Sequence, residues 1–181
     1  MELPQVAIDL QLTSEDHTRG PAGAPITLVE YGDYECPHCI ATFPLVETLL
    51  ETRGDDLRFV FRHFPLTSVH PQASFAAQAA EAAGAQDKFW PMHALLYQEP
   101  GGLTDDAFDR LAIKLNLEIY KFQSDLTTRR FADRVQRVAE QGKSLGVTGT
   151  PTLFVNGRRL SLIAEETPAS LDDKVQRLAQ A

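Results

Sequence analysis

The only two cysteines of this 181-residue chain stand three positions apart, in the segment Cys36-Pro37-His38-Cys39. Two thiols at this spacing can form a disulfide with each other and can pass it on to other thiols. The ring that such a disulfide closes is too small to stabilise the fold much through chain entropy. The motif therefore indicates thiol–disulfide exchange.

The first thiol of the motif is the better candidate nucleophile. A thiolate attacks disulfides, so the site must lower the pKa of one cysteine. Cys36 falls at the expected N-cap of a helix, where free N–H groups and the helix dipole favour an anion, and Pro37 suits the first helical position. His38 can add a hydrogen bond or a positive charge. We expect Cys36 to attack and Cys39, one helical turn further on, to resolve the mixed disulfide.

Two acidic residues, Asp33 and Glu35, precede the motif. Carboxylates close to a thiol raise its pKa and so oppose the thiolate. The sequence leaves open whether these acids or His38 and the helix dipole prevail. The reduction potential and the direction of electron flow stay open with it.

Other uses of a cysteine pair fit less well. A structural zinc site needs four ligands, usually from two such pairs, and the remaining histidines show no ligand spacing to each other. These histidines are His17, His63, His70 and His93. A purely structural disulfide is disfavoured by its small ring. No metal, nucleotide or flavin is expected, because the chain lacks a Gly-rich phosphate loop, so the redox-active disulfide is the only expected cofactor.

Two further features lie outside the motif. Glu30 interrupts the apolar run 26–31, where a buried carboxylate is costly, so we expect burial to raise its pKa and fit it to relay a proton to or from Cys39. The alternative is an exposed Glu at a strand end. Thr150-Pro151 precedes the apolar run 153–155; a proline is tolerated at the start of a strand, and an X-Pro bond there can be cis.

The rest of the chain predicts an α/β pattern around these residues. Residues 26–31 and 57–64 form strands, with a helix from Pro37 between them. Residues 68–146 carry helical patterns that begin near His70-Pro71. Asn156-Gly157 is a hairpin turn between strands 153–155 and 159–163. Thr167 caps and Pro168 opens a final helix.

Together these motifs resemble the DsbA-like thiol-disulfide oxidoreductases of the thioredoxin superfamily. Cys36-Pro37-His38-Cys39 and Thr150-Pro151 match the active-site motif and cis-proline loop, and the likeness extends over roughly residues 17–180. It implies an α/β thioredoxin fold with a core at 25–67 and 147–181 and a helical insertion at 68–146.

The resemblance also implies roles for individual residues. Pro151 is expected cis against the disulfide, and Thr150 is expected to offer backbone hydrogen bonds to a bound peptide or partner cysteine. Glu30 matches the buried acid beneath the dithiol. Trp90 is most simply a packing residue, because large aromatic side chains mostly pack. Its functional interpretation is a wall of the substrate groove beside Cys36.

The charge and hydropathy of the chain exclude some classes of binding partner. A net charge of −8 and a pI of about 5.1 argue against nucleic acid and anionic membrane surfaces. No apolar run is long enough to insert in a membrane. The first 25 residues show no basic segment followed by an apolar core. We therefore expect a cytoplasmic protein or, alternatively, an exported (periplasmic) one whose signal peptide was removed.

Three functions remain in competition. The first is a protein-disulfide oxidoreductase acting on cysteine-containing proteins or peptides and recycled by a redox partner. The second is a glutathione-using relative of the kappa-class transferase or isomerase type, which Cys39 disfavours because those relatives lack an intact C-x-x-C. The third is a non-catalytic thioredoxin-fold binding module. The physiological substrate, the recycling partner and the oligomeric state stay open.

Overall fold

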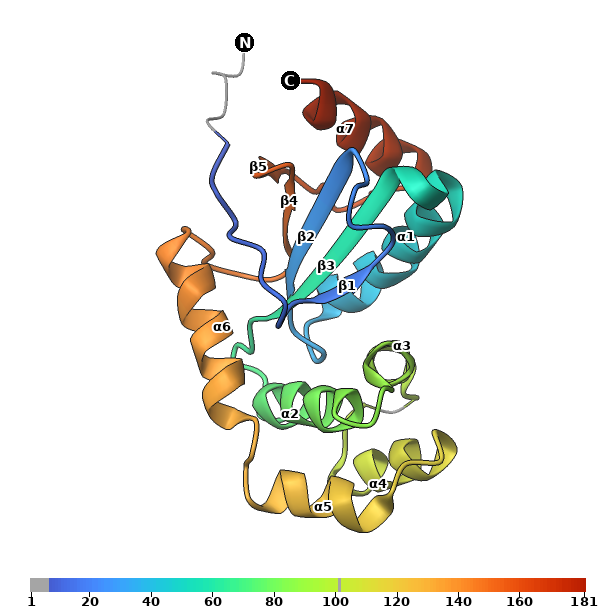
Figure 1. Cartoon of the computed structure of the whole chain (residues 1–181), viewed down its shortest axis with the longest axis vertical. Helices are drawn as coiled ribbons and strands as arrows, with labels where there is room; N and C mark the ends of the chain where they lie inside the picture. The colour runs from blue at the N-terminus through green and yellow to red at the C-terminus, as the bar shows by residue number, and fades with distance from the viewer. Residues whose placement is uncertain (1–6, 101) are drawn as a thin grey trace. The chain divides into compact units, whose positions relative to one another are not determined.

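The computed structural model describes residues 7–100 and 102–181 as a mixed α/β fold with a five-stranded sheet. The elements in chain order are β1 (His17–Arg19), β2 (Ile26–Gly32), α1 (Pro37–Arg53), a 3-10 turn (Gly54–Asp56), β3 (Leu57–His63), α2 (Ala73–Gly84), α3 (Phe89–Gln98), α4 (Asp105–Lys114), α5 (Ile119–Thr127), α6 (Ala132–Ser144), β4 (Thr152–Val155), β5 (Arg158–Leu160) and α7 (Pro168–Gln180). This is the predicted thioredoxin fold with inserted helices (Figure 1). Its described residues divide into two compact units, one with residues 7–31, 41–62 and 151–181, the other with 32–40, 63–100 and 102–150.

The first unit is built on the sheet, whose strand order is β1-β3-β2-β4-β5. β2 is the central strand, and all its residues except Thr27 are buried, which explains its nearly continuous apolar sequence. β4 runs antiparallel to β2, with Glu30 opposite Leu153 and Tyr31 opposite Thr152. The C-terminal hairpin therefore completes the sheet beside the strand that leads to the cysteine motif.

The predicted hairpin turn between β4 and β5 is confirmed. Asn156 and Gly157 have φ angles of 49° and 80°, the left-handed conformations that a tight two-residue hairpin needs. The Asn156 side chain also accepts a hydrogen bond from the N–H of Thr27 (2.8 Å). The turn thus ties the end of β4 to the start of β2.

The edge strand β1 is an element that the sequence pattern did not predict. Its residues pair antiparallel with β3, His17 lying opposite Phe61. Just before it, Asp16 receives two hydrogen bonds from the buried Arg62 of β3, at 2.8 and 2.9 Å. Arg62 also donates to the hydroxyl of Tyr31 at 2.9 Å. A buried ion pair therefore fixes the segment that forms the edge.

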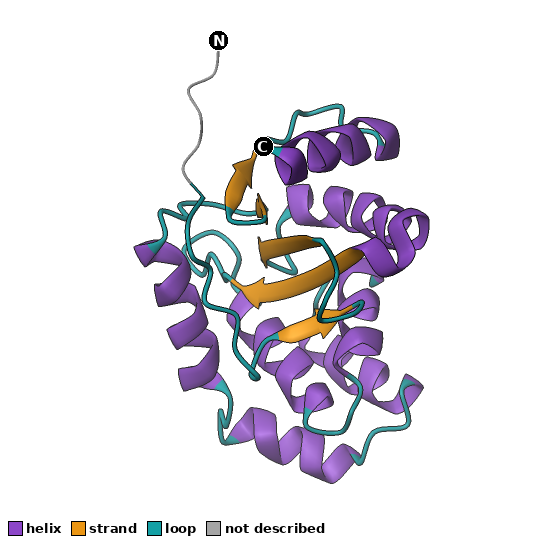
Figure 2. Cartoon of the chain, turned by 45° about the horizontal axis from the view of Figure 1, so that its top comes forward, coloured by secondary structure: helices purple, strands orange, loops and turns teal. Residues whose placement is uncertain are grey.

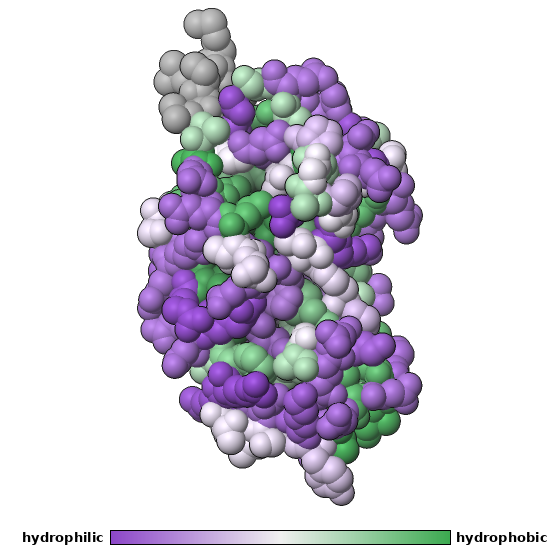
Figure 3. All heavy atoms as spheres, viewed as in Figure 1, coloured by the Kyte–Doolittle hydropathy of each residue, from purple (hydrophilic) through white to green (hydrophobic). Residues whose placement is uncertain are grey.

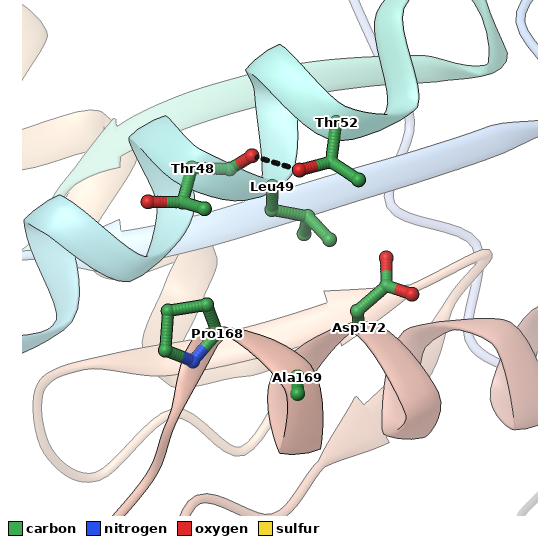
Figure 4. A pocket seen from close by; sticks show the side chains of 6 residues that line it. All are labelled: Thr48, Leu49, Thr52, Pro168, Ala169 and Asp172. Atoms are coloured by element: carbon green, nitrogen blue, oxygen red, sulfur yellow. Dashed lines mark hydrogen bonds between the residues drawn. The ribbon is translucent and has the colours of Figure 1, made fainter.

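Helices α1 and α7 lie side by side in the first unit (Figure 2). Arg53 Nε of α1 donates to Asp172 of α7 at 2.6 Å. The predicted start of α7 is confirmed, since Thr167 and Ser170 form a reciprocal capping box and Pro168 opens the helix. A small pocket opens between the two helices (Figure 4), lined by Thr48, Leu49, Thr52, Pro168, Ala169 and Asp172.

The second unit is a helical block organised around α2. This helix begins at Ala73, three residues after His70, and is rich in alanine; most of its residues are buried. Helices α3, α4, α5 and α6 all contact it. Small side chains let neighbouring helices approach closely, so α2 serves as the core of the block. The face of α6 turned to the viewer in Figure 3 is hydrophilic, as expected for a helix at the margin of the block.

Candidate active site

Cys36 stands immediately before α1, where the sequence places it. Its carbonyl oxygen accepts the first hydrogen bond of the helix, from the N–H of Ile40 at 3.0 Å. Pro37 occupies the first helical position. Cys39 is completely buried and Cys36 is 4% exposed. The two cysteines lie 3.9 Å apart, and both are free thiols in this structure.

The pKa of Cys36 is lowered from its ordinary value of 9.0 to about 5. The largest cause is the hydrogen bond from the Cys39 side chain, and it outweighs the desolvation that raises the pKa. The Thr150 side chain and the backbone N–H groups of Cys39 and His38 lower it further. At neutral pH a thiol with this pKa is about 99% thiolate, the form that attacks disulfides.

Thr150 comes from the segment before β4 and meets Cys36 directly. The Cys36 thiol donates to the Thr150 carbonyl oxygen, with 3.3 Å between sulfur and oxygen. That bond belongs to the protonated thiol and must be given up when Cys36 ionises. The Thr150 hydroxyl is buried and accepts or donates no hydrogen bond within the described part of the chain. The Thr150 side chain nonetheless lowers the pKa of Cys36, because a hydroxyl near the sulfur is a donor for the thiolate.

The two acids before the motif are held by other partners. The Asp33 side chain has no solvent exposure; it accepts hydrogen bonds from the N–H of Leu66 and from His70 Nδ1, both at 2.8 Å. Glu35 accepts from the N–H of Gln72 at 2.6 Å. The sequence left the balance around Cys36 open, and in the folded chain the groups that lower the pKa of this thiol outweigh those that raise it.

The imidazole of His38 is exposed, and the backbone N–H of this residue is among the groups that lower the pKa of Cys36. A contribution of the imidazole itself stays a prediction. Glu30 is only 2% exposed, in the middle of the sheet on β2, so the alternative of an exposed Glu at a strand end is wrong. Pro151 follows Thr150 and leads into β4.

Trp90 lies on α3 in a group of aromatic and imidazole rings. Its ring packs edge-on against Phe89, with 5.1 Å between centroids, and against His93 at 5.2 Å. His93 in turn shares a hydrogen bond of 3.0 Å with the hydroxyl of Tyr34, two residues before Cys36. These contacts bear out a packing role for Trp90; its place in a substrate groove stays a prediction.

The sequence profile of the thioredoxin family matches residues 12–175. Among solved structures, a thioredoxin-like oxidoreductase from Silicibacter pomeroyi superposes with a TM-score of 0.80 at 26% identity, covering 93% of this chain and 95% of that one. Oxidised BdbD from Bacillus subtilis gives 0.75 at 23% identity, covering 91% and 92%. The catalytic domain of Proteus mirabilis ScsC gives 0.78 at 21%, covering 95% and 93%. At these lower identities the likeness shows the fold.

Curated relatives of this chain are named as antiporters, unlike the structural neighbours above. A Na(+)/H(+) antiporter NhaA 1 of Salinispora arenicola is 49% identical over 144 residues, which are 80% of this chain and 22% of that protein. An NhaA 1 of Mycolicibacterium gilvum is 41% identical over 146 residues, 80% of this chain and 24% of that protein. The chain thus spans about a quarter or less of the length of these relatives. In residues 7–100 and 102–181, every helix is too short or too polar to cross a bilayer.

The profile match covers most of the chain, and the fold agrees with it in the sheet, the inserted helices and the position of the cysteine motif. The chain therefore belongs to the thioredoxin family, and its fold is the DsbA-like form.

Proposed function

We propose that this protein is a thiol–disulfide oxidoreductase that exchanges disulfides with protein or peptide thiols through a mixed disulfide at Cys36, which Cys39 resolves. The observation that carries the proposal is the Cys36 thiol at the start of α1, with its pKa lowered to about 5 and a second thiol 3.9 Å away. A low-pKa thiol beside a resolving thiol is the arrangement that makes disulfide exchange fast and reversible.

In the oxidising direction a substrate thiolate attacks the Cys36 sulfur of the Cys36–Cys39 disulfide. The bond between the two cysteines breaks, and Cys39 leaves as a thiolate that takes up a proton. A second substrate thiolate then attacks the substrate sulfur of the mixed disulfide, and Cys36 leaves as a thiolate. The substrate dithiol is oxidised by two electrons and the protein dithiol is the product. In the reducing direction the same steps run backward, from attack by Cys36.

Three residues support these steps in the proposal. Thr150 offers backbone hydrogen bonds to the sulfur or peptide that docks at Cys36, and its carbonyl already contacts that sulfur. Pro151, cis, shapes the docking surface. Glu30, buried on β2, relays the proton to or from Cys39. The lowered pKa of Cys36 favours the reduced dithiol, so the disulfide form is the better donor and oxidation of substrates is the favoured direction.

The similarity to the antiporters covers about a quarter or less of their length. We propose that the matching part of those proteins is a redox domain, and that this chain shares the redox chemistry and not the ion transport. Cysteine-containing proteins or peptides are the substrates, and a separate redox partner restores the disulfide. One structural neighbour, from Salmonella enterica, is described as a periplasmic thioredoxin-like protein. It favours the exported alternative for the compartment.

A trapping experiment tests the proposal. The Cys39→Ser variant cannot resolve a mixed disulfide, so incubation with glutathione disulfide should leave one glutathione on Cys36, visible by mass spectrometry. The matched Cys36→Ser variant keeps only the buried Cys39 and should remain unmodified. Equal labelling of the two variants, or full exchange activity in Cys36→Ser, would contradict the proposal and favour a binding module.

A further inference from the structure

His70 lies between β3 and α2, far from the motif in sequence and bonded to it in space. Its Nδ1 is 2.8 Å from Asp33 Oδ2, and its side chain is 18% exposed while that of Asp33 is fully buried. Asp33 has a second bond to the same loop, from the N–H of Leu66 at 2.8 Å. A buried carboxylate is costly unless it is paired, and His70 is the group that can supply the opposite charge.

Asp33 is also joined directly to the cysteine motif. Its Oδ1 accepts from the N–H of Glu35 at 2.8 Å, and its carbonyl oxygen accepts from the N–H of Cys36 at 3.2 Å. Glu35 reaches back to the N–H of Gln72 at 2.6 Å. These bonds hold the loop that carries His70 and the segment before Cys36 in one arrangement.

Three acidic groups act on His70. Desolvation favours its neutral form, but the hydrogen bond and charge of Asp33, followed by the charges of Cys36 and Glu35, raise its pKa above the ordinary 6.5. Electrostatic interaction is mutual, so a protonated His70 stabilises the Cys36 thiolate as much as the thiolate stabilises the imidazolium. Without that positive charge, the buried Asp33 carboxylate would keep its hydrogen bonds from the N–H groups of Leu66 and Glu35 but lose the opposite charge of the imidazolium.

We propose that His70 is a positioning residue that neutralises Asp33 and so keeps Cys36 ionised. This inference rests on the proposed function, since it concerns the same thiol. It assigns to His70 the electrostatic role that the sequence suggested for the imidazole of His38. The acidic residues before Cys36 then do not suppress the reactivity of the thiol, because the positive charge of His70, in the loop before α2, offsets their negative charge.

The test is a pH titration of the thiolate absorbance of the reduced protein. His70→Gln removes the positive charge and should raise the midpoint of Cys36 by about one pH unit, a roughly tenfold higher proton affinity. Lys114→Gln removes an equal charge from an exposed position on α4 of the same unit and should leave the midpoint unchanged. His70→Lys keeps a positive charge and should keep the midpoint nearer to that of the wild type than His70→Gln does.

An unchanged midpoint in His70→Gln, or an equal shift in Lys114→Gln, would overturn the proposal. If His70→Gln does not fold, His70→Lys is compared with the wild type instead. Its Cys36 titration midpoint should then stay within about half a pH unit of the wild-type value. A larger rise would overturn the role of the His70 charge. Disulfide exchange should persist, more slowly, in every folded variant. If the Cys36 midpoint does not change in His70→Gln while disulfide exchange persists, the role of His70 is rejected and the proposed function is not.

Discussion

The lowered pKa of Cys36 makes a quantitative prediction about stability. In the folded reduced protein the thiol has a pKa of about 5, against 9.0 when unperturbed. Between these values the folded state holds a thiolate and the unfolded state a thiol, so the unfolded state binds one more proton and stability rises with pH. The contribution is full above pH 9 and is lost as the pH falls toward 5. Four units at about 1.36 kcal/mol each amount to roughly 5 kcal/mol over the whole range.

Removal of the thiol isolates this contribution. Urea unfolding of the reduced wild type and of Cys36→Ala, both with reductant present, gives the difference in their free energies of unfolding at each pH. That difference should change in favour of the wild type by about 3 kcal/mol between pH 6 and pH 8. The disulfide form has no thiol to ionise, so it should lack this dependence and serves as the control.

The refuting result is a difference between the two reduced proteins that stays constant from pH 6 to pH 8. It would mean that Cys36 keeps an ordinary pKa in the folded state, and that its place before α1, its bond with Cys39 and the Thr150 side chain do not stabilise the thiolate. The proposal that the disulfide form is a good oxidant would then lose its physical basis.

Three other predictions concern single residues. Glu30→Gln should slow resolution of the mixed disulfide severalfold and flatten its pH dependence in stopped-flow exchange, because an amide cannot relay a proton; an unaltered pH profile would exclude the relay. Arg62→Ala leaves Asp16 without its buried partner and should lower the free energy of unfolding by about 3–5 kcal/mol in urea; a loss below about 1 kcal/mol would show the pair to be unimportant. Gly20→Ala should destabilise by about 1–3 kcal/mol, because φ is 85° and a Cβ would lie 2.1 Å from a backbone oxygen, while Gly23→Ala, with open space, should be near neutral.

Local signals explain why much of the site could be predicted from sequence. The position of Cys36 before a helix follows from an apolar strand, two cysteines and a proline within a few residues. The burial of Glu30 follows from the apolar run around it, and the hairpin turn follows from Asn156-Gly157. Each of these features depends on neighbours in the chain, so a sequence pattern contains it.

Other features depend on contacts between distant segments and leave no local pattern. The edge strand β1 exists because it pairs with β3, since its residues show no alternation of apolar and polar types. The pair of Asp33 and His70 joins residues that lie 37 positions apart. From sequence alone Asp33 is a charge that opposes the thiolate and His70 a residue near a helix start. Only the folded chain shows that they are partners.

The reduction potential of the Cys36–Cys39 couple tests the central claim most directly. It is measured by equilibrating the protein with defined ratios of reduced and oxidised glutathione and counting free thiols. A pKa of about 5 lies between the values of about 7 for thioredoxin, at about −270 mV, and about 3.5 for DsbA, at about −120 mV. Interpolation predicts a potential of about −180 mV, that of a disulfide donor. A potential of about −270 mV or lower would contradict the account and indicate a reductase.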